Sequence, residues 1–186
     1  MIKIVFVTGN IDKWQIANKI LTPYGITLEQ IKIDTPEIQS MDVEEIAKNS
    51  AIFASRQLGK PVIKTDVGYY FDAFDNFPGP FIKYVNQWLT AEEILDIAKK
   101  RKSNGVIIRE CLAYSTSDGK TSTFIGETRG QFAKTVGGSG SPIDKILIRE
   151  SMNVVQGLVS SQEMLEYWAK NLNHFHEFGK YIKSTN

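Results

Sequence analysis

Hydrophobic positions along the chain alternate between short continuous runs and longer stretches of helical period. Residues 2–7 (IKIVFV) form an almost unbroken apolar, β-branched run, which is typical of a strand buried on both faces. Apolar residues then recur at helical spacing from Lys13 to Leu21, until Pro23 and Gly25 interrupt the pattern. The chain therefore opens with a strand, a sharp corner and a helix.

The alternation continues and predicts one mixed α/β domain over residues 1–186. The further predicted elements are strands at 27–33 and 61–66, helices at 44–59, about 90–100 and 161–172, and a hairpin over 106–133. A capping box from Thr90 to Glu93 opens the second of these helices, and Asp118-Gly119 predicts a two-residue turn in the hairpin. Residues 135–142 (TVGGSGSP) are expected to form a flexible loop.

Composition narrows the class of protein. Of the 186 residues, 42% are hydrophobic and 23% are charged, as in ordinary globular domains, and the net charge is +1. So small a charge gives no overall field for nucleic acid or an acidic membrane, and neither is an expected partner. Cys111 is the single cysteine, which excludes an internal disulfide and favours a reducing compartment. No run approaches the roughly 20 apolar residues of a membrane span, and the N-terminal run is too short for a secretion signal. We therefore expect a cytoplasmic protein.

The corner after the first strand, Thr8-Gly9-Asn10, is the first candidate for chemistry. A strand–turn–helix corner directs backbone N–H groups and the positive end of a helix at whatever lies above it, which suits a phosphate. Gly9 permits close approach, the Asn10 amide can donate, and Lys13 supplies a cation. Any α/β protein also needs such a corner, and the Walker pattern GxxxxGK[ST] is absent, so both interpretations remain open.

Two acidic residues follow at the ends of predicted strands. Glu37 lies in TPEIQ after the second strand, and Asp66 ends PVIKTD. Carboxylates at strand ends beside the first corner are suited to hold Mg²⁺ over a polyphosphate or to deprotonate a water, although each is also explained as a solvated turn acid. Further on, FPGPFIKYV (residues 77–85) is a rigid aromatic turn that places Lys83 either toward a nucleotide or on a packed surface.

Taken in order, these pieces resemble the inosine triphosphate pyrophosphatase family. The resemblance rests on VTGNIDK, PEIQ, the strand ending in Asp66 and FPGPFIK, and it extends to GETRGQFA and a late helix with Lys170-Asn171. It implies an elongated mixed β-sheet flanked by helices, with two lobes and a central nucleotide cleft. It also implies a homodimer that cleaves non-canonical purine nucleoside triphosphates (ITP, dITP, XTP) to monophosphate and pyrophosphate with Mg²⁺.

Carried over residue by residue, the resemblance gives each candidate in the phosphate half of the site a role. It implies that Thr8, Gly9, Asn10 and Lys13 bind the triphosphate, that Glu37 coordinates the metal, and that Asp66 is the metal-linked acid that activates water. Lys83 stands at the position of the lysine in the family's PGPYIK pattern, and the resemblance implies a less definite role for it. The family carries an acid before Asp66, where this chain has Thr65, so one negative charge is missing.

The base-reading half departs from the family pattern. The family loop G-F-G-[YW]-D-P-x-F corresponds to GGSGSPIDKI, which lacks the aromatic residue and places Ser141 at the aspartate. The family's S-H-R-x-x-A falls near residues 174–179, and neither an ungapped nor a one-residue-shifted match supplies the arginine. The candidates that remain are Phe175, to stack on the base, His176, at the arginine position of the ungapped match, and Lys170, to approach a purine 6-oxo group.

Other interpretations stay open for several features. Cys111 with His174 and His176 would form a nucleophile–base pair or a metal site, whereas a lone cysteine in an apolar strand is usually an inert hydrophobe. The GGSG segment is a phosphate cradle, a mobile loop or an altered base pocket, and the apolar stretch from Phe77 to Trp88 is a subunit contact or a core. The alternative functions are a nucleotide-binding protein with weak turnover and a pyrophosphatase of altered base specificity.

Overall fold

The protein is described by a computed structural model that covers residues 1–36 and 38–185. The strands are β1 (Ile2–Val7), β2 (Ile26–Ile31), β3 (Val62–Phe71), β4 (Pro78–Gly79), β5 (Gly105–Ser115), β6 (Thr121–Phe132) and β7 (Leu147–Arg149). The α-helices are α1 (Ile11–Leu21), α2 (Val43–Leu58), α3 (Ile82–Trp88), α4 (Ala91–Arg101), α5 (Ser161–Asn171) and α6 (Asn173–Thr185). Short 3₁₀ turns are η1 (Thr22–Tyr24), η2 (Asp72–Phe74) and η3 (Gln156–Leu158).

The strands form one mixed sheet in the order β2-β1-β3-β5-β6-β7, with β4 paired to β3. β1 is parallel to both β2 and β3, whereas β4 is antiparallel to β3 and β7 is antiparallel to β6. Helices flank these strands, so the predicted α/β class with a mixed sheet is confirmed. None of the helices in the described part of the chain is long and apolar enough to cross a membrane.

The chain divides into two compact units. The first contains Met1–Asp66, Glu110–Gly126 and Leu165–Asn186, and the second contains Val67–Arg109 and Glu127–Met164. Strands β3, β5 and β6 each continue from one unit into the other. The number of units agrees with the two lobes that the resemblance implies.

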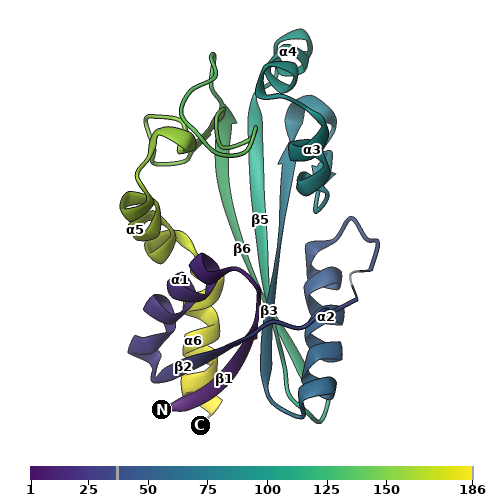
Figure 1. The fold of residues 1–186 in the computed structure, drawn as a ribbon, viewed down its shortest axis with the longest axis vertical. Coiled ribbons are helices and arrows are strands. Elements are labelled where there is room, and N and C mark those ends of the chain that lie inside the picture. The colour runs from purple at the N-terminus through teal and green to yellow at the C-terminus, as the bar shows by residue number, and fades with distance from the viewer. Residues whose placement is uncertain (37, 186) are drawn as a thin grey trace. The chain divides into compact units, whose positions relative to one another are not determined.

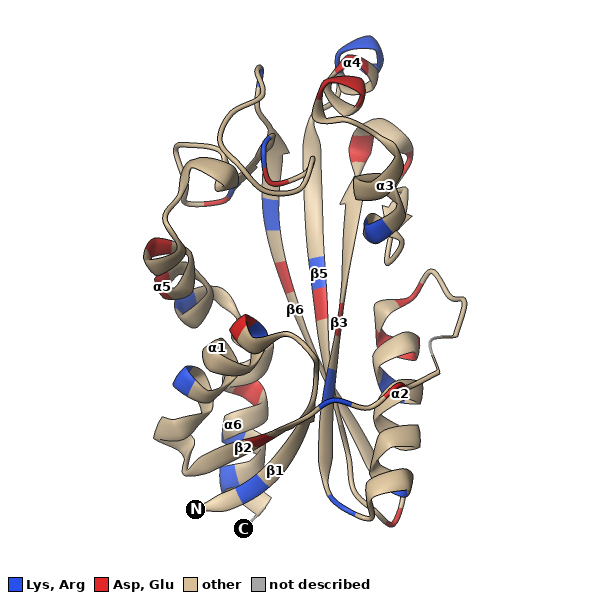
Figure 2. Cartoon of the chain, viewed as in Figure 1, with Lys and Arg blue, Asp and Glu red and all other residues tan. Residues whose placement is uncertain are grey.

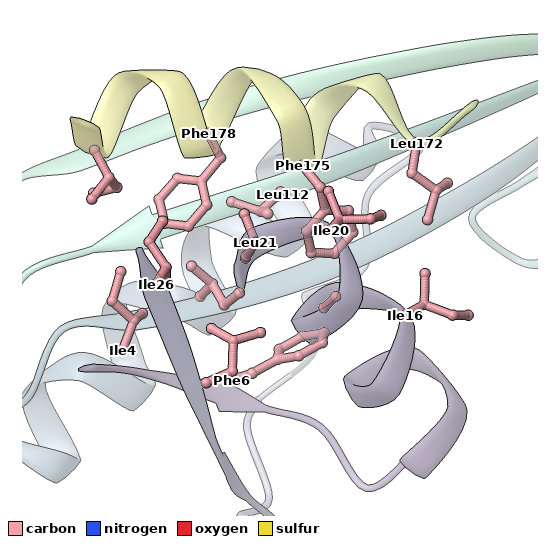
Figure 3. Packing of buried hydrophobic residues seen from close by; sticks show 14 residues of the cluster. Ile4, Phe6, Ile16, Ile20, Leu21, Ile26, Leu112, Leu172, Phe175 and Phe178 are labelled. Atoms are coloured by element: carbon pink, nitrogen blue, oxygen red, sulfur yellow. The ribbon is translucent and has the colours of Figure 1, made fainter. Parts of the chain in front are cut away.

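Helices α1 and α6 share one face of the sheet in the first unit (Figure 1). Their apolar residues Ile16 and Phe178 pack in one core with Phe6 of β1, Ile63 of β3 and Leu112 of β5. Figure 3 shows this core, with the start of α6 beside the first half of α1. We call it the α1/α6 core.

Helix α2 covers the opposite face of the first unit (Figure 1). Its small residues Ala47 and Ala51 pack on Cys111 and Ala113 of β5. Successive side chains of a strand point to opposite faces, which is why Cys111 faces α2 while its neighbour Leu112 enters the α1/α6 core. Gly59 ends α2 in the left-handed conformation at φ 62°, as the sequence predicts.

The second unit has its own core, formed by α4 and the ends of the long strands. Ile94 and Ala98 of α4 pack with Phe71, Ile108 and Phe132. The predicted capping box opens this helix. The Thr90 hydroxyl accepts from the Glu93 N–H at 3.2 Å, and the Glu93 carboxylate accepts from the Thr90 N–H at 2.8 Å.

Strand β3 is longer than predicted. The expectation that Asp66 ends a strand was wrong, because β3 continues to Phe71 and Asp66 lies within it. Val67 and Tyr69 pack against the second core together with the buried Phe71, so the aromatic segment after Asp66 has the two-residue period of a strand. The sequence had predicted an irregular segment after Asp66 because Gly68, Asp72 and Asp75 are typical of turns.

The hairpin tip and the C-terminal segment also differ from prediction. The Thr116 N–H donates to the Lys120 carbonyl at 2.9 Å, and Gly119 has φ 88°, so the tip is a three-residue loop and not a two-residue turn. Helix α6 was not predicted at all. Its signal was the helical spacing of Phe175 and Phe178 around two histidines.

Candidate active site

The corner between β1 and α1 is built by short hydrogen bonds among the predicted residues. The Thr8 hydroxyl accepts from the Asn10 N–H at 3.1 Å, and Asn10 Oδ1 accepts from the Lys13 N–H at 3.0 Å. Asn10 is therefore the N-cap of α1, and Gly9, Asn10 and Lys13 are exposed at the positive end of the helix. Sequence and structure agree on an exposed corner that can receive an anion.

Lys32 also lies at this corner, although no pattern in the sequence around it marks it. The methylene groups of its side chain lie 3.5 Å from where a Cβ on Gly9 would be, so the chain of Lys32 runs across the glycine. The pairing of Val7 with Ile31 makes Lys32 the next residue of the neighbouring strand. Lys32 is distant from Gly9 along the chain, so only the pairing of β2 with β1 reveals that the two residues are neighbours.

Asp66 lies at the level of the corner. β1 and β3 are parallel, with Val5 beside Val62 and Phe6 beside Ile63. Continued by two to three residues, this register places the chain at Thr8 and Gly9 beside Thr65 and Asp66. That Asp66 belongs with the first corner stays a prediction.

The Asp66 carboxylate lies in a region of negative charge on the α2 face. Its Oδ2 is buried. Burial, followed by the charges of Glu44, Asp66 and Asp42 in that order, raises the pKa of the Cys111 thiol to about 12. Glu44 is fixed by the Thr123 hydroxyl, which donates to it at 2.6 Å. The buried, protonated thiol has the character of a small hydrophobe, which favours that interpretation of Cys111.

Whether the residues near the corner can hold a metal ion depends on how many protein ligands that ion needs. In the described ranges 1–36 and 38–185, no three or more His, Cys, Asp or Glu side chains are grouped to hold one. Glu37, the predicted ligand, lies outside the described residues. Mg²⁺ over a polyphosphate usually takes only one or two carboxylates and completes its shell with phosphate oxygens and water. The Asp66 carboxylate can supply one such ligand.

The predicted base-reading residues are differently placed. Phe175 is only 5% exposed and packs edge-on against Phe6, with ring centroids 6.3 Å apart. His176 uses both ring nitrogens: Nε2 lies 3.0 Å from the Ala169 carbonyl and Nδ1 lies 3.2 Å from the Tyr24 hydroxyl. A carbonyl can only accept, so Nε2 carries the hydrogen and Nδ1 accepts from Tyr24 in the neutral ring. Both residues have structural roles in the first unit.

The two predicted lysines outside the corner are exposed and lie in different units. Lys170 is in the last turn of α5, in the first unit, and Lys83 is in the first turn of α3, in the second unit. The second unit also has a groove of about 770 Å³ between α4 and residues 132–136. None of the predicted site residues lines that groove.

The GGSG segment is a hydrogen-bonded loop in the second unit. The Ser139 N–H donates to the Gly157 carbonyl at 2.9 Å, and the Ser141 N–H donates to the Asp144 carboxylate at 2.8 Å. These amides are consumed inside the protein, which argues against a phosphate cradle. Gln156 donates to the same Asp144 carboxylate at 2.6 Å, so the expected flexible loop is held at several points.

Proteins similar to this chain form a consistent set. A model of the Ham1 family matches residues 4–166. A Methanopyrus kandleri protein named dITP/XTP pyrophosphatase is 34% identical over 181 residues, 96% of each chain. A Methanosarcina mazei protein of the same name is 32% identical over 140 residues, 75% of this chain and 76% of that one. The solved structure of a HAM1 protein from Coxiella burnetii matches with a TM-score of 0.79 over 99% of this chain and 100% of that one, at 18% identity, which shows the fold.

Proposed function

Because the chain belongs to the Ham1 family, we propose that it hydrolyses non-canonical purine nucleoside triphosphates (ITP, dITP and XTP) to the monophosphate and pyrophosphate. The names of the relatives supply the substrate class. One structural observation supports the reaction: the anion-receiving corner of β1 and α1 lies at the level of the Asp66 carboxylate on the adjacent parallel strand.

The corner binds the triphosphate. The N–H groups of the first turn of α1 other than that of Lys13, which is hydrogen-bonded to Asn10, face the phosphate oxygens, and Lys13 and Lys32 contribute two cations. Gly9 leaves room for the phosphate to approach the backbone. The same groups stabilise the negative charge that develops on the pyrophosphate leaving group, which lowers the barrier to its departure.

Asp66 orients the attacking water and accepts its proton. Its Oδ2 is buried, and a carboxylate is one of the groups that serve as a general base. Mg²⁺, with Asp66 and Glu37 as its protein ligands, supplies charge neutralisation and polarises the phosphoryl oxygens when it is bound. Thr65 adds no second charge, so Asp66 carries the acid–base role alone.

Lys83 and Lys170 contribute cations to nucleotide binding, and the enzyme acts on the free nucleotide pool of the cytoplasm. It is a homodimer, and the exposed aromatic residues of α3 form its subunit contact. We assign no base-stacking role to Phe175, because its ring is covered by the α1/α6 core.

Pyrophosphate release from ITP, measured on wild type and on Asp66→Asn and Lys13→Ala, tests the reaction. We expect Asp66→Asn to lower kcat by about 100-fold or more, since general-base catalysis contributes that much. Asp118→Asn, at the exposed hairpin tip, is the matched control and should keep full activity. Wild-type protein inert towards common and deaminated triphosphates would contradict the proposal, and nucleotide binding by calorimetry without turnover would identify a binding protein instead.

A further inference from the structure

A groove in the second unit is formed by residues that have no place in the proposed reaction. It lies between α4 and the segment 132–136, and both of its walls belong to the second unit. Its volume is about 770 Å³. Sites for small organic molecules commonly have volumes of roughly 300–1,000 Å³, so the groove is large enough for a ligand of nucleotide size.

The surface between the two walls is largely apolar. Ala98 and Phe132 line the groove and are buried in the second core. Leu95 and Val136 line it as half-buried side chains that pack against the same core. Apolar side chains with a small number of polar groups around them are typical of sites for organic ligands. A bare inorganic ion would make no use of this apolar surface.

Three lysines line the groove from both of its walls. Lys99 lies in the last turn of α4, Lys102 follows that helix, and Lys134 belongs to the opposite wall. All three are exposed, and within residues 1–36 and 38–185 none of them forms an ion pair. The dipole of α4 favours cations at its C-terminal end, but Lys134 lies outside the helix. The groove therefore holds cations that no carboxylate of the described chain neutralises.

The backbone of Lys102 points to a role for its side chain. Lys102 ends α4 in the left-handed conformation at φ 54°, and its N–H donates to the Lys99 carbonyl at 3.2 Å. Gly59 ends α2 in the same conformation. Glycine adopts this conformation without steric cost, whereas a residue with a Cβ is strained in it. A lysine in place of glycine is explained if its side chain is needed in the groove that it lines.

Carboxylates line the other end of the groove. Glu92 and Asp96 lie one turn apart on the face of α4 that also carries Lys99. Neither carboxylate is ion-paired in the part of the chain that the structure describes. Figure 2 shows acidic bands along α4 and a basic segment at its end. The helix from Glu92 to Lys102 is about 15 Å long, so hydrogen-bond acceptors and cations occupy opposite ends of the groove.

We propose that this groove binds a nucleoside phosphate, at a site separate from the corner of β1 and α1. The phosphate groups lie among Lys99, Lys102 and Lys134, which form charge-assisted hydrogen bonds with them. The nucleoside lies along the apolar surface, and its ribose hydroxyls donate to Asp96 and Glu92, since carboxylates are common acceptors for ribose. Inorganic phosphate would leave the apolar surface and the carboxylates unused. An uncharged organic molecule would leave the lysines unpaired.

Calorimetric titration with ADP tests the site. We expect the wild type to bind ADP, and Lys99→Ala with Lys134→Ala, which removes one cation from each wall, to raise its Kd by about 10-fold or more. One lost hydrogen bond to a charged group has an effect of that size. The matched control is Lys100→Ala, because Lys100 is in the same turn of α4 but is not one of the residues that line the groove. This control should keep the wild-type Kd, and thermal melts establish that each variant is folded.

A second probe separates the nucleoside from the phosphates. Inorganic pyrophosphate carries the phosphates alone, so it should bind the groove about 10-fold or more weakly than ADP, the effect of losing a hydrogen bond to a carboxylate. Asp96→Asn should weaken the binding of ADP and should not weaken that of pyrophosphate. If pyrophosphate binds the groove as tightly as ADP does, only the phosphates are recognised, and a nucleoside ligand is ruled out.

Titrating both probes into Lys13→Ala as well counts binding at the corner of β1 and α1 separately. ADP should still bind to Lys13→Ala, because Lys13 does not line the groove. The groove site is refuted if the wild type binds no ADP, if only Lys13→Ala abolishes binding, or if Lys100→Ala weakens it as much as the double variant does. The groove and the proposed reaction use different residues, so pyrophosphate release from ITP by a wild type that fails these titrations would leave the proposed function standing.

Discussion

At the residue scale, the burial of His174 decides its charge and makes stability depend on pH. Burial, and to a lesser extent the charge of His176, lower the pKa of His174 from 6.5 to about 3. The folded protein keeps the ring neutral, while the unfolded chain takes up a proton as pH falls below about 6.5. The free energy of unfolding should therefore be highest above this pH and decrease toward pH 3, by at most about 1.4 kcal/mol per pH unit from this residue.

Urea denaturation of wild type and His174→Leu between about pH 7 and pH 4.5 measures this contribution. The variant cannot take up the proton in either state, so its free energy of unfolding should fall less on acidification. His176 is present in both proteins and cancels in the difference. Parallel pH dependences in the two proteins would show that the ring is protonated in the fold.

Lys32 and His176 show, at the same scale, what a residue pattern leaves out. Lys32 contacts Gly9 only because β2 pairs with β1 in one register, and nothing in its local sequence marks it. His176 matched a ligand position by counting along the chain, yet Tyr24 and Ala169 hold both of its ring nitrogens. A side chain's partners are set by tertiary packing, which spacing alone does not contain.

At the element scale, the loop around Gly138 is a packed connection, and a substitution there should destabilise the protein. Gly138 has φ 74°, and a Cβ on it would lie 2.2 Å from backbone atoms of Gly157. Gly138→Ala should therefore lower the free energy of unfolding by more than the roughly 1–3 kcal/mol of left-handed strain alone. Chemical denaturation measures the change.

Gly119→Ala is the control for this substitution. Gly119 also has a positive φ, 88°, but the nearest atom to its Cβ position is Arg56 Nη2 at 3.9 Å. The loss of stability in Gly119→Ala therefore measures the backbone strain of a positive φ without a steric clash at the added Cβ. Equal losses of unfolding free energy in the two variants would mean that the loop around Gly138 shifts to accommodate the added Cβ, as a mobile loop would.

Elements with strong local signals were predicted from sequence, and elements that depend on long-range pairing were not. The first strand and helix, the Thr90 cap and the Gly59 stop are encoded by adjacent residues, and all are confirmed. The predicted strand ended too early, at Asp66, because the outer half of β3 (VGYYF) contains a glycine next to consecutive aromatic residues and has no clear alternating pattern. The same limit applies to the site. The phosphate corner is one local motif, whereas Lys32 reaches it only through the register of β2 with β1.

At the scale of the whole molecule, the exposed aromatic residues of α3 bear on whether the stretch from Phe77 to Trp88 is a subunit contact or a core. Trp88 is 72% exposed and Tyr84 is 46% exposed, and their rings lie 5.6 Å apart, one helical turn from each other. Phe81 continues the row at 6.5 Å from Tyr84. These rings are not core, and an exposed aromatic row of this kind is typical of a protein–protein contact.

The proposed homodimer should therefore depend on this row. Trp88→Lys with Tyr84→Lys should weaken self-association by at least about 30-fold, the loss expected when central aromatic contacts of an interface are removed. Light scattering after size exclusion, over a range of concentrations, measures the mass. Leu158→Lys is the control, because Leu158 is similarly exposed outside α3 and its loss should leave the dimer intact. A dimer that survives the α3 variant would place the contact elsewhere, and a wild type that is monomeric at every concentration would contradict the dimer itself.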